Sequence, residues 1–118
     1  MREIVGKGTV QSYGTATIVA SAGATTDVVA APGANKFIRV LGWQGTAGSA
    51  NGSVKWLDST PTNKTGVMDI AQYGGFVAPP VDWDEGYFDC AANTKLQMTT
   101  VGCTFNGVVQ YAVISVVS

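Results

Sequence analysis

The stretch KFIRVLGWQ, residues 36–44, decides the fold class of this chain. Successive side chains of a β-strand point to opposite faces of a sheet, and this stretch has large apolar residues for both faces. Strict alternation places Phe37, Arg39, Leu41 and Trp43 on one face and Ile38, Val40 and Gly42 on the other. Arg39 then lies among apolar neighbours, so we expect it to reach an edge or to pair with an acid.

Similar runs, alternating or apolar and bounded by Gly, Pro, Asn and Ser, recur along the chain, and no segment keeps a helical period. We expect strands at residues 8–11, 15–20, 26–30, 36–44, 53–59, 65–70, 75–78, 86–90, 95–100 and 107–117. The last run is apolar on both faces, which predicts a central strand or one covered by a neighbouring subunit. About eight to ten short strands predict an all-β fold, a β-sandwich of the jelly-roll type.

Residues with turn chemistry separate the expected strands. Residues 31–35 are expected to form a turn and residues 45–52 a longer flexible loop. Pro61 and the pair Pro79 and Pro80 should each end a strand, because proline lacks a backbone N–H. The dipeptide Asn106-Gly107 is the strongest two-residue hairpin signal in the chain.

The length of 118 residues fits one domain. We assign residues 13–118 to the sandwich. Residues 1–12 form either an arm that pairs with a neighbouring chain or an ordinary first strand.

Charged residues are unusually sparse. They make up 13% of the chain, against about 25% in ordinary soluble domains, while hydrophobic residues make up 46%. Too few charges remain to cover the surface, so we expect part of it to be buried in an oligomer or against a partner. The net charge of -1 offers no basic patch for phosphates, so nucleic acid is not expected as a partner.

The chain lacks the residues that several kinds of catalysis and metal binding need. The chain has no histidine, which removes the usual general base and the usual metal ligand, and no phosphate-binding loop motif. Cys90 and Cys103 match no zinc spacing and are expected to be buried thiols. No apolar run is long enough for a signal peptide or a membrane span, so we expect a soluble protein made in a cytoplasm. We also expect no cofactor.

One segment concentrates acids and aromatic residues. Asp82, Asp84, Glu85 and Asp89 lie beside Trp83, Tyr87 and Phe88. The acids suit a solvated loop or a partner contact; a calcium site and a pair of glycosidase carboxylates are the alternatives. The aromatic residues suit packing in a core or interface, and the alternative is a surface that stacks on sugars.

From residue 35 to residue 114, the order of features resembles that of small tailed-bacteriophage structural proteins, including head decoration (cement) proteins with jelly-roll-like folds. The pieces that carry the resemblance are KFIRVLG (36–42), VKWL (54–57), TGVM (65–68), GGFVAP (74–79), GYF (86–88), residues 96–99 and YAVI (111–114). The resemblance implies a homo-oligomer, a trimer or dimer, on the outer surface of a virion. There it would bind the major capsid protein and stabilise the capsid.

The sequence therefore predicts a structural protein and not an enzyme. The alternative is a carbohydrate- or receptor-binding module of a phage tail or fibre. A small hydrolase using Asp82 and Asp84 is a third, weaker hypothesis. Partner contacts are expected from the start of the chain, the 45–52 loop and the aromatic segment, with these candidate residues: Arg2, Glu3, Ile4, Val5, Lys7, Trp83 and Tyr87.

Overall fold

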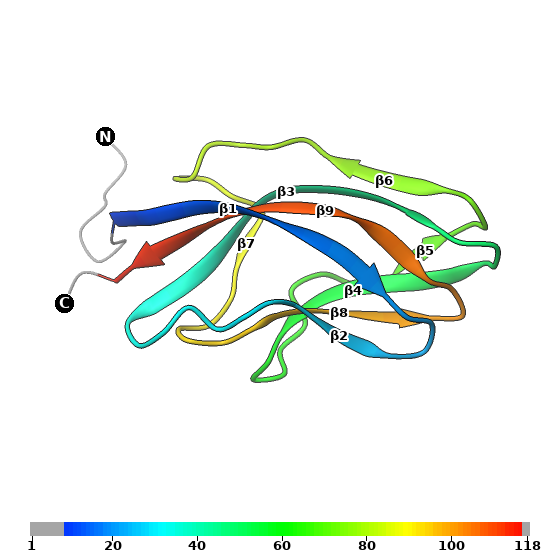
Figure 1. The fold of residues 1–118 in the computed structure, drawn as a ribbon, viewed down its shortest axis with the longest axis horizontal. Helices are drawn as coiled ribbons and strands as arrows, with labels where there is room; N and C mark the ends of the chain where they lie inside the picture. Colours follow the sequence, from blue (N-terminus) through cyan, green and yellow to red (C-terminus); the bar gives the residue numbers. More distant parts are fainter. Residues whose placement is uncertain (1–8, 117–118) are drawn as a thin grey trace.

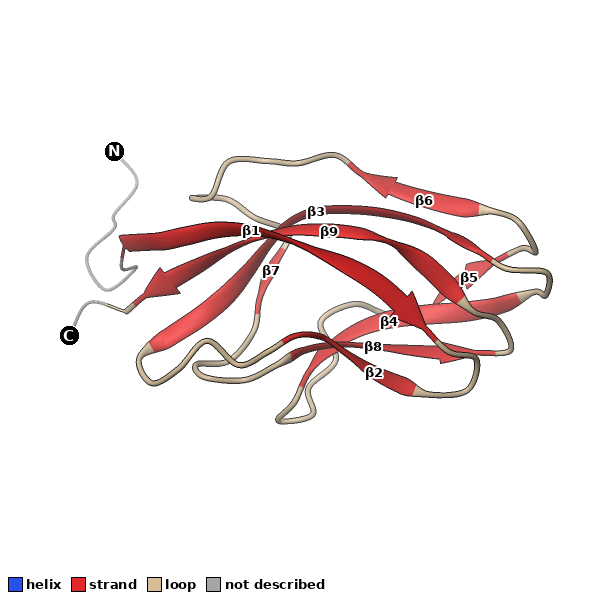
Figure 2. Cartoon of the chain, in the orientation of Figure 1, coloured by secondary structure: helices blue, strands red, loops and turns tan. Residues whose placement is uncertain are grey.

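The computed structural model describes residues 9–116, which form two antiparallel sheets packed as a sandwich, with strands and no helix (Figures 1 and 2). The nine strands are β1 (Thr9–Ala20), β2 (Thr25–Val29), β3 (Lys36–Ala47), β4 (Gly52–Asp58), β5 (Met68–Ile70), β6 (Gly75–Ala78), β7 (Phe88–Asp89), β8 (Leu96–Val101) and β9 (Phe105–Ser115). The all-β sandwich expected from the sequence is confirmed.

The strand order is that of a jelly roll. One sheet has the order β1-β9-β3-β6, with β7 also pairing with β3, and the other has the order β2-β8-β4-β5. The chain runs out through β1 to β4 and returns through β5, β6, β8 and β9. Each returning strand pairs with an outgoing one: β5 with β4, β6 with β3, β8 with β2, and β9 with β1. Such a folded antiparallel ribbon is the eight-stranded jelly-roll topology, here with the two-residue β7 added.

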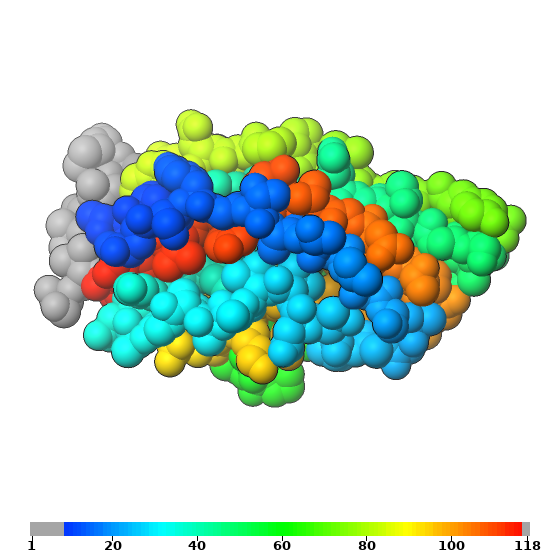
Figure 3. Space-filling view, viewed as in Figure 1, coloured from blue at the N-terminus to red at the C-terminus, as the bar shows by residue number. Residues whose placement is uncertain are grey.

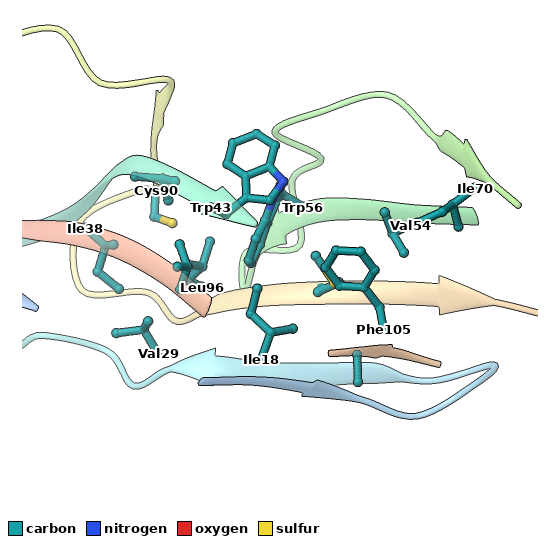
Figure 4. Close-up of a cluster of buried hydrophobic side chains, with 14 of the residues drawn as sticks. Ile18, Val29, Ile38, Trp43, Val54, Trp56, Ile70, Cys90, Leu96 and Phe105 are labelled. Atoms are coloured by element: carbon teal, nitrogen blue, oxygen red, sulfur yellow. The ribbon is translucent and has the colours of Figure 1, made fainter. Parts of the chain in front are cut away.

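The core lies between the two sheets (Figure 4). Trp56 from β4 is fully buried, and its ring meets that of Trp43 from β3 edge-on with centroids 5.7 Å apart. Phe105, Ile18 and Leu96 are fully buried around them. Both cysteine thiols are buried, as the sequence predicted.

The first two expected strands are one strand. Strands are expected at residues 8–11 and 15–20, with Gly14 in the gap between them, yet β1 runs unbroken from Thr9 to Ala20 with a bulge at Gln11. Gly14 is inside the strand because the Tyr111 ring lies against it. A Cβ on Gly14 would come within 2.4 Å of the Tyr111 ring, so this glycine permits close packing and does not form a turn.

A second bulge corrects the faces assigned to residues 36–44. The pairing of β3 with β9 skips Leu41, so that the side chains after it change face relative to strict alternation. Trp43 therefore joins Ile38 and Val40 in the main core, and not Arg39 and Leu41 as expected. Arg39 does pair with an acid, Asp89, as the sequence predicted.

Two expected connections also differ from the structure. The dipeptide Asn106-Gly107 lies inside β9 and forms no hairpin; the turn before β9 includes Gly102, whose φ is +79°. Gly107 allows β9 to approach β3, since a Cβ there would lie 1.9 Å from the Gln44 carbonyl oxygen. The expected loop at 45–52 is shorter than predicted: β3 continues to Ala47 and β4 begins at Gly52, so only residues 48–51 connect them.

The remaining expectations fare better. Strand β9 is central, between β1 and β3, as its apolar faces predicted. The strands expected at 26–30, 53–59, 75–78 and 95–100 appear with ends within two residues. The strands at 65–70 and 86–90 shrink to β5 and β7.

Candidate protein-binding surface

The outer face of the β1-β9-β3-β6 sheet presents two rows of uncharged side chains. The pairing register places Thr17, Val108, Gln44 and Val77 in one row across the four strands, and Val19, Asn106, Thr46 and Gly75 in the next. We call these eight residues the neutral face. They alternate along each strand with core residues such as Ile18 and Val109, so they point away from the core.

The neutral face is exposed and partly hollow. Val19 and Val77 are 64% and 72% exposed. Between β3, β6 and β9 the surface has a depression of about 280 Å³, lined by Gln44, Gly45, Thr46, Gly75, Phe76, Val77, Asn106, Gly107 and Val108. A Cβ on Gly75 would lie 2.8 Å from the Gly45 carbonyl oxygen, so this glycine lets β6 lie close to β3. An uncharged concave surface of this kind is suited to an apolar or amide-bearing projection from another protein.

The other end of the same outer face is covered by a loop. Val81 N–H donates to the Leu41 carbonyl and Tyr87 N–H donates to the Val40 carbonyl, so the loop leaves and rejoins the edge of β3 at the bulge. Between these points, the N–H groups of Glu85 and Gly86 both donate to the Asp82 carbonyl and close a turn. The Trp83 side chain folds back from this turn onto a small apolar cluster formed by Leu41, Ala112 and Ile114.

Arg39 holds this loop in place. Its Nε donates to Oδ1 of Asp89 at 2.6 Å and its Nη2 donates to Oδ2 at 3.0 Å, a two-point ion pair. Its Nη1 donates to the Trp83 carbonyl at 2.8 Å. The hydrogen bonds to Asp89 raise the pKa of Arg39 further, despite the opposing effect of burial. The arginine therefore serves to anchor the loop.

The candidate aromatic residues of the loop are both used for packing. Trp83 is half-buried on the apolar cluster. Tyr87 meets Trp43 edge-on with centroids 5.4 Å apart and donates its hydroxyl to the Pro79 carbonyl, while 43% of it remains exposed. The sugar-stacking alternative thus depends on Tyr87, the more exposed of these two rings, beside the exposed Asp82 and Glu85.

In residues 9–116 the His, Cys, Asp and Glu side chains form no metal site, and the Cys90 thiol is not activated. No group of three or more His, Cys, Asp or Glu side chains in residues 9–116 could hold a metal ion. Burial, and then the nearby Asp58 carboxylate, raises the pKa of the Cys90 thiol to about 12, so it stays protonated at neutral pH. Cys103 is buried as well.

Comparisons with known proteins add no identification. No protein-family model, curated protein or solved structure matches this chain. Among residues 9–116, no helix is long and apolar enough to cross a membrane.

The remaining candidate residues from the sequence have different outcomes. Arg2, Glu3, Ile4, Val5 and Lys7 fall outside the described residues. Of the 45–52 segment, Gly45 and Thr46 border the depression from within β3. Sparse charge was the only sign of the neutral face in the sequence, and its position required the register of four strands that are far apart in the chain.

Proposed function

We propose that this protein is a non-enzymatic structural protein of a bacteriophage particle. It binds the outer surface of the major capsid protein lattice and stabilises the capsid, and it acts as a homo-oligomer. The observation that carries the proposal is the neutral face, an exposed and partly concave surface without a charged side chain among its eight residues. The resemblance in the order of sequence features supplies the capsid as the partner.

The physical argument is one of many modest contacts. An uncharged surface can be buried without the cost of removing unpaired charges from water. The side chains of a sheet face over a packed core are already positioned by strand pairing, so little conformational entropy needs to be lost when the face binds. On a repeating lattice, an oligomer that binds at several points holds on far more tightly than one copy does.

Charges placed on the neutral face test the proposal. Gln44→Lys with Thr46→Lys adds two cations to the wall of the depression, at exposed positions. Val67→Lys with Val101→Lys is the matched control, since these valines are 65% and 59% exposed and lie in or beside the other sheet. Each variant is added to purified capsids assembled without the protein, and binding is measured by co-sedimentation.

We expect the first variant to bind capsids at least about tenfold more weakly than the wild type, because each buried unpaired charge costs more than 1 kcal/mol. The control should bind within about twofold of the wild type. Particles carrying the wild type should also release DNA at a higher temperature than bare particles. Equal binding by both variants, or no binding by the wild type, would overturn the proposal.

The alternative is a carbohydrate- or receptor-binding module of a tail or fibre. Its support is the exposed part of Tyr87 beside exposed acids. A glycan array distinguishes the two functions. Saturable binding to a sugar that is lost in Tyr87→Ala and kept in Gln44→Lys with Thr46→Lys would favour the alternative.

A further inference from the structure

The four outer strands of the sandwich differ sharply in how well their free edges are protected. Strand β5 has three residues including Asp69, and β6 has four residues followed by Pro79 and Pro80. Strand β2 has five residues with Asp27 and a bulge after it. Short length, charge, proline and bulges are the means by which proteins keep edge strands from pairing.

Strand β1 has almost none of this protection. It has 12 residues, no charge and no proline, and its one bulge at Gln11 leaves residues 12–20 as a regular strand. It pairs only with β9, so its other edge has no strand partner among the described residues. Figure 3 shows β1, in blue, uncovered along its length. A long, uncharged edge of this kind is a site for pairing with another strand.

We propose that two copies of this chain pair antiparallel through β1, about a two-fold axis at Ala16. This register matches the whole regular segment with itself, from Ser12 opposite Ala20 of the second copy inward. On the outer face it sets Tyr13 opposite Val19 and Thr15 opposite Thr17. Aromatic with β-branched, and threonine with threonine, are favourable cross-strand pairs.

The second copy is the occupant that the charges favour. Neither β1 nor its neighbour β9 carries a charged residue, so two identical edges meet without repulsion. A charged segment of another protein would find no countercharge there. Tyr13 and Val19, which are 63% and 64% exposed in the single chain, would cover each other in the pair.

The pair also has a consequence for binding. A two-fold axis perpendicular to the sheet keeps both outer faces on the same side, so the two neutral faces would form one continuous surface. This inference deepens the proposed function, because it names the surface for its self-association. It is tested on the free protein, so that its outcome is separate from binding to a capsid.

The first experiment is sedimentation equilibrium over a wide concentration range. The wild type should show a monomer–dimer equilibrium. Thr15→Lys with Thr17→Lys sets lysine opposite lysine twice in the proposed register, and should raise the dimer dissociation constant at least about tenfold. An equimolar mixture of this double lysine variant with the double variant Thr15→Glu with Thr17→Glu should restore dimers. The matched control, Gln44→Lys with Thr46→Lys, carries the same charge on the same face two strands away and should dimerise like the wild type.

The second experiment reads the register. Tyr13→Cys and Val19→Cys are prepared as separate variants and mixed under oxidised glutathione. The mixture should form a disulfide-linked dimer, because the register sets the two new thiols opposite each other. Each variant alone should not form one, because its new thiol has no thiol opposite it and Cys90 and Cys103 are buried. Three outcomes would each overturn the proposal. The wild type could be monomeric at all concentrations, the dimer could be lost only in the Gln44 and Thr46 control, or cross-linking could show no preference for the mixture.

Discussion

The two outer faces of the sandwich use polar side chains in opposite ways. On the β2-β8-β4-β5 sheet, Asp27 accepts hydrogen bonds from Lys95 at 3.0 Å and Gln97 at 2.7 Å, and the hydroxyls of Thr25 and Thr99 lie 2.7 Å apart. On the neutral face of the other sheet, none of the eight residues is charged. Charges and hydroxyls thus link neighbouring strands on one outer face, and the neutral face carries uncharged side chains.

The two sheets also differ in the charge that each one buries. Asp58 of β4 is fully buried: one oxygen accepts from the Thr60 and Thr62 N–H groups and the other from the Ala91 N–H at 2.9 Å. Arg39 of β3 is buried on the outer side of its sheet, beneath the Trp83 loop. Each charge ties a loop to the sandwich.

The largest effect is expected at Asp58. Asp58→Asn replaces one acceptor oxygen with an NH₂ group, which leaves a buried N–H or two donors facing each other. We expect the free energy of unfolding to fall by about 3 kcal/mol, measured by urea denaturation. Asp69→Asn, at an exposed position in the same sheet, is the control and should change it by less than about 0.5 kcal/mol. Equal losses in the two variants would contradict this account.

The same carboxylate predicts a dependence on pH. Burial would raise the pKa of Asp58, but the hydrogen bonds from Thr60, Ala91 and Thr62 outweigh it and hold the pKa well below its usual value of 3.8. A carboxyl with a depressed pKa in the folded state stabilises the fold above its unfolded pKa, and this stability is lost as pH falls below that value. Thermal unfolding of the wild type should therefore show a falling melting temperature below about pH 4, and Asp58→Asn should show a shallower fall.

Removing the Trp83 ring, which anchors its loop on apolar residues, should reduce the free energy of unfolding less than the Asp58 change does. Trp83→Ala uncovers the cluster of Leu41, Ala112 and Ile114 and should cost about 2 kcal/mol, less than a fully buried tryptophan. Tyr73→Ala removes an aromatic ring that is 72% exposed and serves as the control, expected to cost under about 0.5 kcal/mol. If Trp83→Ala were as stable as this control, the ring would not be part of the fold's packing.

The ion pair between Asp27 and Lys95 should contribute less still to the free energy of unfolding. Hydrogen bonds from Gln97 and then Lys95 lower the pKa of Asp27, but the carboxylate and the ammonium are 54% and 48% exposed. Asp27→Asn should reduce the free energy of unfolding by at most about 1 kcal/mol, and by less in high salt. A loss that is unchanged by salt would indicate that the hydrogen bond from the Gln97 side-chain NH₂ group, and not the ion pair, is responsible.

The smallest change in stability is expected from charging the neutral face. Gln44→Lys with Thr46→Lys should shift the free energy of unfolding by no more than about 0.5 kcal/mol, since both side chains are exposed. The comparison between the faces therefore predicts a separation: losing charges from one sheet weakens folding, and adding charges to the other weakens only binding. A large loss of stability in this variant would break the comparison.

Local patterns in the sequence predicted the strands but not their exceptions. Pro79 and Pro80 end β6 as expected, and the apolar residues of 107–117 correctly indicated a central strand. The failures are at glycines and bulges. Gly14 and Gly107 have the local signature of a turn, yet each makes room for a group from another strand, the Tyr111 ring and the Gln44 carbonyl. No local pattern distinguishes a glycine that turns the chain from one that admits a neighbour.

The sequence by itself determined the all-β class, the sandwich and the shortage of charge, because these depend on the type and spacing of neighbouring residues. The tertiary structure alone decided where the shortage of charge matters. The bulge at Leu41 sends Trp43 into the core, and the register of β1, β9, β3 and β6 collects Val19, Asn106, Thr46 and their neighbours on one face. Register is a property of pairs of strands, so it is set by packing between segments that are distant in the chain.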